Sequence, residues 1–186
     1  MRRIAPDRDS LLAILAEVFR EHGYEGASLS LIGEATRLGK GSLYHFFPGG
    51  KEEMAEAALA HIGGWFDRSV FLPLRPPSEP KEGILRMLAM VEDYFHGGER
   101  ICLVGALALA QSRDRFSERI SAYFRTWHHD LAKALVRGGA PTPRAESQAE
   151  EALAAIQGTL VLARALDDKA PFNRMMARLR EELTAF

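Results

Sequence analysis

The chain has 186 residues, 47% of them hydrophobic and 26% charged, which is the composition of an ordinary globular protein and excludes a disordered or fibrous chain. No apolar run reaches the roughly 18 to 20 residues that a membrane span needs, and no apolar segment follows the charged start, so we expect a cytoplasmic protein with no membrane partner. A formal net charge of -1 means that any binding to nucleic acid must come from a local patch rather than from overall charge.

The chain is predicted to begin with two helices. Apolar residues recur every three or four positions over residues 11–19, which indicates an amphipathic helix that ends near Gly23. A second, short helix can be capped by Ser28 or Ser30 and run to Thr36. Its alternation of serine and leucine also allows a strand, although no partner strand is evident elsewhere in the chain.

A third short helix is predicted over Gly39–Phe47. Pro48-Gly49-Gly50 then breaks the chain before Lys51 opens a long fourth helix. Prolines that follow this helix predict a connector that cannot be helical, namely Pro73, Pro76, Pro77 and Pro80. A fifth helix is expected over Ile84–Phe95.

Residues 101–111 are almost wholly apolar and small, which predicts a helix buried on most of its sides. Cys102 lies in it and is expected to be inert core rather than a redox sensor. A single cysteine allows no internal disulfide and no thiolate metal cluster. We therefore expect neither a metal nor a cofactor.

Three more helices complete the predicted fold. One spans residues 116–135, and the next begins at Thr142, a cap followed by proline at the first helical position. It runs to about Asp167 with Val161 among its inward residues, and the last helix restarts at Pro171. The sequence thus predicts an all-α fold of about nine helices.

Two short helices joined by a tight turn are typical of a helix-turn-helix, in which the second helix contacts DNA bases. An ordinary helical hairpin has the same outline. In the predicted recognition helix Lys40, Ser42 and His45 point donors outward, while Gly41 lets backbone come close. No acid lies between residues 35 and 50, and the N-termini of the second and fourth helices each offer free N–H groups to a phosphate.

Residues 28–54, SLSLIGEATRLGKGSLYHFFPGGKEEM, closely resemble the helix-turn-helix of the tetracycline repressor (TetR) family. The shared positions are Ser28, Ile32, Lys40-Gly41, Leu43-Tyr44, Phe47 and Lys51. The form Ser-Leu-Tyr-His-x-Phe-Pro-Gly-Gly-Lys, with Cys-Leu-Val in the later apolar helix, is most similar to the LmrA/YxaF-like branch of that family.

Three positions depart from the family pattern. The turn glycine is Arg37, the position that caps the third helix is Gly39, and the alanine after isoleucine is Gly33. A non-glycine residue in a left-handed turn costs roughly 1 to 2 kcal/mol, which the fold can absorb. Alternatively the turn shifts, which would change the side chains that meet the bases.

The resemblance implies a DNA-binding domain over residues 1–50 and a ligand-binding and dimerisation domain over residues 51–186. The partner is double-stranded operator DNA, and Ser28, Tyr44 and Lys51 are expected to hold its phosphates. The full set of DNA-binding residues that the resemblance implies is Ser28, Arg37, Gly39, Lys40, Gly41, Ser42, Tyr44, His45 and Lys51.

By the same resemblance Lys40, Ser42 and His45 lie along the major groove. Lys40 can donate to guanine, which favours a half-site that contains a G·C pair. Arg2 and Arg3 can reach the adjacent minor groove or can stay untethered.

In the family the last two long helices pair with their copies in a second chain, and small or adaptable residues at these positions agree with a homodimer. The expected interface residues are Ala152, Ala155, Ile156, Thr159, Met175, Met176 and Leu179. A two-fold dimer would present two recognition helices to a pseudo-palindrome.

The effector pocket of such proteins lies among helices four to eight. Its candidate residues are Trp65, Phe66, Phe95, Leu103, Leu107, Gln111, Phe124, Trp127, His128, Gln157 and Arg164. Aromatic residues at helical spacing usually fill cores, whereas a polar group on an apolar face needs a partner that a ligand can supply. Arg164 favours an anionic or carbonyl-bearing ligand, or pairs with a nearby acid.

We therefore predict a ligand-responsive, DNA-binding transcriptional repressor rather than an enzyme, which a small-molecule effector releases from its operator. The helix from Lys51 to Trp65 is the expected link between effector and DNA. Two alternatives are a helical protein-interaction module and a small hydrolase that uses Cys102 with His128 or His129. No nucleophile motif supports the hydrolase, and adjacent histidines diverge by about 100 degrees around a helix.

Overall fold

The computed structural model describes residues 7–185, and this range contains nine α-helices and no strand. The predicted all-α fold is confirmed, and the strand alternative at residues 28–31 is wrong. The described chain forms two compact units, of which the first holds residues 7–64 with Leu103–Ile120 and the second holds the remainder. Two of the three boundaries fall inside α4 (Gly50–Phe66) and α7 (Ser117–Arg137), and the third lies between Cys102 and Leu103.

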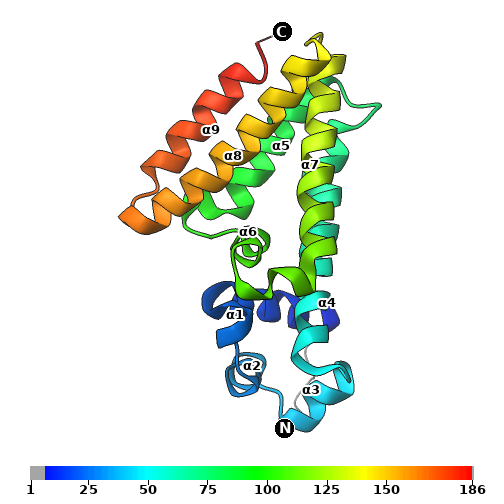
Figure 1. Ribbon diagram of the computed structural model, residues 1–186, viewed down its shortest axis with the longest axis vertical. Helices are drawn as coiled ribbons and strands as arrows, with labels where there is room; N and C mark the ends of the chain where they lie inside the picture. The colour runs from blue at the N-terminus through cyan, green and yellow to red at the C-terminus, as the bar shows by residue number, and fades with distance from the viewer. Residues whose placement is uncertain (1–6, 186) are drawn as a thin grey trace. The chain divides into compact units, whose positions relative to one another are not determined.

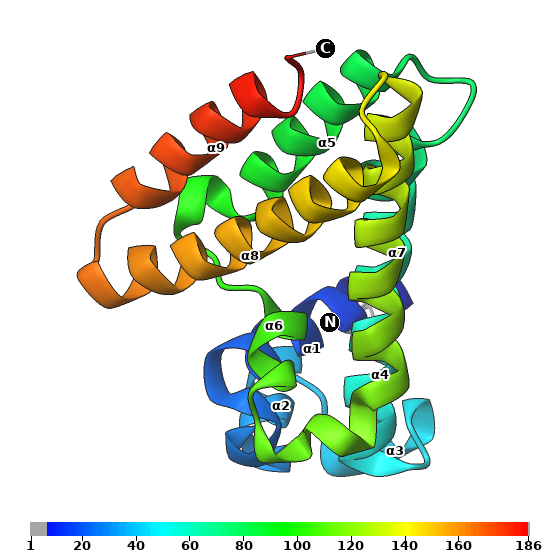
Figure 2. The same ribbon diagram turned by 45° about the horizontal axis from the view of Figure 1, so that its top comes forward.

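The first unit is built around α1 (Arg8–Gly26). This helix begins at Asp7, whose carboxylate accepts a hydrogen bond from the backbone N–H of Ser10 at 3.0 Å and satisfies a free donor of the first turn. Gly23, with a φ of 66°, kinks the helix where its end was predicted, but another turn follows. Two further helices of this unit, α2 (Leu29–Thr36) and α6 (Leu103–Ala108), both pack against α1 (Figure 2).

The helix predicted over residues 101–111 is shorter than expected. It ends at Ala108, because Ala110 adopts an extended conformation with φ -85° and ψ 162° that leads into the 3-10 segment Gln111–Phe116. Cys102 is buried as predicted, whereas Leu109 is 87% exposed. Apolar composition alone therefore did not show where this helix ends.

The chain stays helical beyond α4, through a π-helical turn at Asp67–Phe71 and a 3-10 turn at Leu72–Leu74. The prediction that Pro73 and Pro80 lie in a non-helical connector is wrong, since Pro80 is the first residue of the next helix. Pro73 occupies the first turn of its segment, where an N–H would have no partner within the helix, so proline is tolerated. The chain leaves the helix at Arg75, with ψ 157°, before α5 (Pro80–Tyr94) begins.

Two long helices close the chain, α8 (Thr142–Leu166) and α9 (Ala170–Glu182), and α9 packs against both α8 and α5 (Figure 1). Asp167 ends α8 in a left-handed conformation, close to the predicted boundary. Thr142 is the first helical residue rather than the cap, a difference of one position that is common at helix ends. Val161 is 62% exposed instead of inward, because it follows the buried Leu160 by one residue and so points about 100 degrees away.

An aromatic cluster fills the second unit around Phe66, which has no exposed surface. Ring centroids of its neighbours lie 4.7 to 6.2 Å from that of Phe66. These neighbours are Trp65, Phe71, Tyr94, Phe95, Tyr123 and Trp127. Burial raises the pKa of Tyr123 well above its usual value, and the Cys102 thiol contributes next, so the hydroxyl stays protonated.

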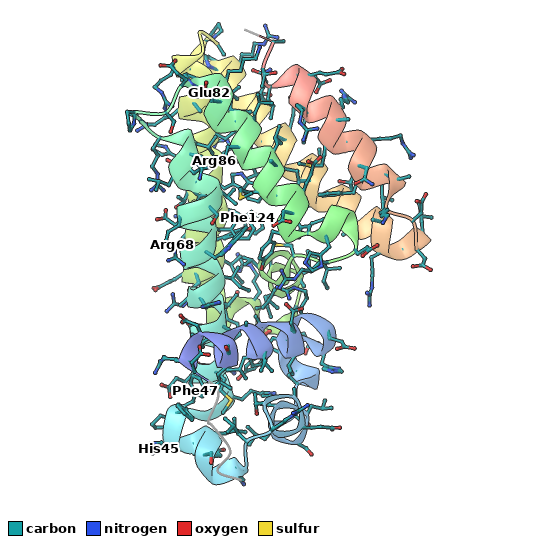
Figure 3. All side chains as sticks on the ribbon, turned by 180° about the vertical axis from the view of Figure 1, so that it is seen from behind. His45, Phe47, Arg68, Glu82, Arg86 and Phe124 are labelled. Carbon is teal, nitrogen blue, oxygen red and sulfur yellow. The ribbon has the colours of Figure 1, made fainter. Side chains whose placement is uncertain are left out.

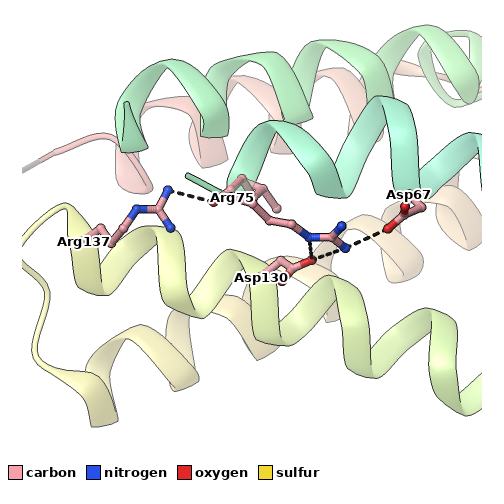
Figure 4. Close-up of polar contacts among 5 residues, drawn as sticks. Asp67, Arg75, Asp130 and Arg137 are labelled. Atoms are coloured by element: carbon pink, nitrogen blue, oxygen red, sulfur yellow. Dashed lines mark hydrogen bonds and ion pairs between the residues drawn. The ribbon is translucent and has the colours of Figure 1, made fainter. Parts of the chain in front are cut away.

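Arg75 ties the connector after α4 to α7 (Figure 4). Its Nε donates to Asp130 Oδ2 at 2.9 Å and its Nη2 donates to Asp67 Oδ1 at 2.7 Å. The hydrogen bond to Asp130 is the main cause that raises the pKa of Arg75. Arg137 adds a second tie by donating to the backbone carbonyl of Leu74 at 2.8 Å.

Within residues 7–185 we find no helix that is both long and apolar enough to cross a membrane. In the same range, no three side chains of His, Cys, Asp or Glu come together in a way that could hold a metal ion.

Candidate functional site

The predicted DNA-binding segment begins at Ser28, one of the two caps that the sequence allowed. Its Oγ accepts a hydrogen bond from the backbone N–H of Leu31 at 3.2 Å, and Ser28 itself is exposed. The first turn of α2 contains no acid. The positive end of this helix therefore stays available to an anion.

The turn between α2 and the recognition helix α3 (Lys40–Phe46) keeps its shape without glycine. Arg37 takes the left-handed conformation, with φ 58° and ψ 27°. The left-handed conformation is the one that the first of the two alternatives implied, with a strain of roughly 1 to 2 kcal/mol that the fold absorbs. Thr36 supports the turn, since its buried hydroxyl donates to the carbonyl of Ile32 at 2.7 Å.

Exposure separates the two faces of α3. Leu43 is buried, as is Phe47 directly after the helix, and Phe46 is half-buried. Figure 3 shows His45 and Phe47 at the end of the first unit where α3 lies. The exposed residues are Lys40, Gly41, Ser42, Tyr44 and His45, preceded by the exposed Gly39. Since α3 has no acid in its first turn, its open face is uncharged or basic.

Lys51 is less free than a phosphate-binding lysine was expected to be. Its Nζ donates to the backbone carbonyl of Tyr24 at 2.8 Å, and the carbonyl of Glu25 lies 3.4 Å away. An ammonium has three donors, so one stays available to an anion. Tyr24 could not be predicted from the sequence, because this contact joins residues 27 positions apart.

The start of α4 is a weaker anion site than the sequence predicted. Glu52 and Glu53 lie in its first turn, and Glu53 Oε2 accepts a hydrogen bond from the N–H of Gly49 at 2.7 Å. These carboxylates already face the positive end of the helix. The start of α2 is therefore the better of the two helix ends for a phosphate.

The predicted effector residues are divided between the two units. Leu103 and Leu107 are buried in the first unit, where Gln111 is exposed and can be satisfied by solvent. In the second unit Phe124 (Figure 3) is half-buried, and its ring centroid lies 5.0 Å from that of Tyr123. The structure brings four of the predicted residues together in the aromatic cluster, namely Trp65, Phe66, Phe95 and Trp127.

The polar effector candidates of the second unit differ in what they contact. His128 Nε2 lies 3.1 Å from the backbone carbonyl oxygen of Glu146, and Arg164 is exposed, so both are satisfied without a ligand. Trp127 Nε1 and Gln157 Nε2 are buried and have no hydrogen-bond partner among the described residues. Both nitrogens are donors, and a buried donor without an acceptor costs free energy.

The predicted dimer residues fall into two groups. Ala152, Ala155, Met175 and Leu179 line an open groove of about 560 Å³ between α8 and α9. The other three, Ile156, Thr159 and Met176, do not line this groove and are buried within the chain's own core. Helix α8 also has an exposed face of small and apolar residues, which comprises Ala154, Gly158, Val161, Leu162, Ala165 and Leu166.

Two family models match the chain. Residues 11–58 match the tetR family of bacterial regulatory proteins, and residues 80–178, more than half of the chain, match the C-terminal domain of LmrA/YxaF-like transcriptional regulators. The uncharacterised HTH-type transcriptional regulator YxaF of Bacillus subtilis is 27% identical over 168 residues, which is 88% of either protein.

Solved structures agree with this fold. A TetR transcriptional regulator from Legionella pneumophila superposes with a TM-score of 0.81 at 19% identity, over 96% of this chain and 98% of that one. The TetR family regulator CifR, a cysteine mutant complexed with 26-bp double-strand operator DNA, superposes with a TM-score of 0.76 at 27% identity. That match covers 97% of this chain and 99% of CifR.

The exposed recognition helix, the helical fold and these matches define a DNA-binding transcriptional regulator of the helix-turn-helix class. More narrowly, the chain belongs to the tetR family of bacterial regulatory proteins and has an LmrA/YxaF-like C-terminal domain, as the resemblance implied. Its relatives are transcriptional regulators rather than enzymes.

Proposed function

We propose that this protein is a cytoplasmic repressor that binds a pseudo-palindromic operator as a homodimer and is released by a small-molecule effector. DNA binding is assigned to residues 1–50, and effector binding and dimerisation to residues 51–186. The observation that supports this most is the open face of α3, where only exposed polar, small or basic residues lie on a helix anchored from below by Leu43 and Phe47. CifR, whose structure contains operator DNA, supports the same role by similarity.

The proposed DNA contacts divide by chemistry. Ser28, Tyr44 and the remaining donor of Lys51 contact phosphates, which positions the protein on the duplex. Arg37 and Gly39 flank the start of α3, and the groove-facing side chains follow from Lys40 onward. The arm of Arg2 and Arg3 lies outside the described residues.

Dimerisation is proposed through the exposed face of α8 and the groove beside α9. Gly158 supports this, because no atom lies within 4 Å of where its Cβ would stand, so the fold of one chain does not require glycine there. Glycine inside a helix costs up to about 1 kcal/mol relative to alanine, a cost that close approach of a second copy would explain. Val161, Leu162 and Leu166 would then be covered.

Effector binding is proposed in the second unit, at the aromatic cluster. Trp127 Nε1 supports it, since an acceptor on a ligand would satisfy this buried donor, and Gln157 Nε2 is a second buried donor in the same unit. A ligand that prefers the form of the protein with weak DNA affinity lowers operator binding by linkage. Quenching of tryptophan fluorescence by a candidate effector tests this directly, because both tryptophans lie in the cluster.

Lys40→Gln tests DNA binding. Lys40 is exposed and holds no ion pair among the described residues, so its replacement leaves the fold intact. We expect affinity for duplexes from the gene's own upstream region to fall by about tenfold or more, which corresponds to roughly 1 to 3 kcal/mol for a lost base contact. Titrations at two salt concentrations would show the steep slope that phosphate contacts cause.

The matched control is Lys81→Gln, an exposed lysine in the first turn of α5 in the second unit. It removes the same charge and should bind as the wild type does. Equal loss of affinity in both variants would show that the effect is one of net charge only. Absence of salt-dependent binding by the wild type would contradict the proposed function itself.

A further inference from the structure

Tyr24 stands at a junction inside the first unit. It follows the kink of α1 at Gly23 and is half-buried. Its ring stacks with that of Phe19, with the ring centroids 6.2 Å apart, and meets the ring of Phe116 edge to face, with the centroids 5.1 Å apart. Two cations also lie over it, with Lys51 Nζ 4.5 Å and Arg115 Cζ 5.6 Å from the ring centroid. One side chain therefore contacts elements from three separate parts of the sequence.

Lys51 connects this junction to α4. It is the second residue of that helix, and besides lying over the ring it donates to the Tyr24 carbonyl at 2.8 Å. Both the ring and the backbone of Tyr24 therefore hold the same ammonium. The position of α4 at its first turn is fixed from the end of α1.

The start of α4 in turn packs against the recognition helix. Gly50 has a φ of +68°, and a Cβ built on it would stand 3.5 Å from Cε1 of Tyr44. Tyr44 belongs to α3, one residue after the buried Leu43. Gly50 also donates its backbone N–H to the carbonyl of Phe47 at 2.9 Å, so Lys51, which Tyr24 holds, directly follows a residue bonded to the end of α3.

The segment Gln111–Phe116 and the start of α7 hold α4 from the other direction. Arg115 Nη1 donates to Glu52 Oε2 at 2.6 Å, and one helical turn further along Arg119 pairs with Glu56. Arg115 shares its guanidinium between Glu52 and the face of Tyr24. Cation and aromatic face attract each other electrostatically, and leucine lacks this attraction at similar size.

We propose that Tyr24 is a positioning residue for operator recognition, which holds the first turn of α4, and through it α3, at the angle that base contacts require. Arg115 contacts Tyr24 from residues 111–119. Movement of these residues therefore alters operator recognition without any contact between them and DNA. This inference rests on the proposed operator binding. Base contacts depend on such geometry, whereas binding through phosphates depends mainly on charge.

The experiment compares Tyr24→Phe and Tyr24→Leu with the wild type. Affinity is measured by fluorescence anisotropy for the upstream duplex that the wild type binds most tightly and for a random duplex of equal length, at several salt concentrations. We expect Tyr24→Phe to stay within about twofold of the wild type because it keeps the aromatic face. Tyr24→Leu should bind the upstream duplex about tenfold more weakly, with its affinity for random DNA and its salt slope unchanged.

Arg115→Met provides a second variant. The side chain of Arg115 is 48% exposed, so this variant is expected to fold even if a substitution at Tyr24 prevents folding. It should weaken upstream binding in the same selective way. The inference is overturned when Tyr24→Leu and Arg115→Met both bind the upstream duplex as the wild type does, or when either loses specific and random binding equally. A wild type without preference for any upstream duplex removes the proposed function and this inference together.

Discussion

Gly41 is a residue that the fold of one chain does not require. It lies in the first turn of α3, no atom stands within 4 Å of where its Cβ would be, and its φ is not positive. Alanine suits a helix better, because glycine loses more conformational freedom on folding. The proposed approach of DNA to α3 would explain the absence of a side chain here.

Gly41→Ala should separate stability from DNA binding. We expect the free energy of unfolding to rise by about 0.4 to 1 kcal/mol, and operator affinity to fall by about tenfold because the methyl group meets the DNA. Thermal unfolding and anisotropy titration measure the two effects. A variant that is more stable and binds equally well would show that Gly41 does not face DNA.

Residue-scale prediction succeeded where the cause is local. The cap at Ser28 follows from the chemistry of a few neighbouring residues, whereas the left-handed conformation of Arg37 was one of two alternatives that the family resemblance left open. Tyr24 and its contact with Lys51 could not be predicted, because they depend on how α1 meets α4. The unpartnered Trp127 Nε1 is likewise visible only once its surroundings are known.

At the scale of elements, Arg75 holds the connector after α4 to α7. The two aspartates with which it pairs, Asp67 and Asp130, differ in exposure. The side chain of Asp130 is 10% exposed and that of Asp67 is 52% exposed. Removing one partner from a buried charged pair is costly, whereas exposed pairs contribute little. The two acids therefore form a matched pair for mutation.

Asp130→Ala should lower the free energy of unfolding by about 1 to 3 kcal/mol, because Arg75 then loses its charged hydrogen bonds to a buried carboxylate. Asp67→Ala should change it by less than about 0.5 kcal/mol. Urea unfolding of both variants checks the difference. Equal effects would mean that burial does not decide the strength of this contact.

Periodicity and breakers located nearly every helix, but two elements show their limits. Pro73 was assigned to a non-helical connector, yet a proline in a first turn is compatible with helix. The apolar run at residues 101–111 gave no sign of the exposed Leu109, since composition does not show where backbone turns away. Local sequence was enough to predict that these segments are helical. The residues at which the helices begin and end depend on packing.

At the scale of the whole molecule, recognition of a pseudo-palindrome requires two copies of α3. In the proposed dimer, the exposed face of α8 is the surface on which this depends. Family resemblance indicated α8 and α9 as the dimer helices, but only the structure separates Ile156, which is buried, from Val161, which is 62% exposed.

Val161→Glu should convert the dimer to a monomer, because it places a charge in the centre of that face without disturbing the core. Leu109→Glu is the control, since Leu109 is 87% exposed and lies in the first unit. Sedimentation velocity at micromolar concentration distinguishes the two states. Dimers of both variants, or a monomeric wild type, would contradict the assigned interface.

Hydroxyl-radical footprinting of the protein on its gene's upstream DNA tests the central claim most directly. The account predicts two protected patches on one side of the duplex, related by two-fold symmetry and spaced about one helical turn or a multiple apart. Val161→Glu should lose this protection at concentrations where the wild type retains it. A single patch without symmetry, or uniform protection that appears only at low salt, would contradict a dimeric operator-binding repressor.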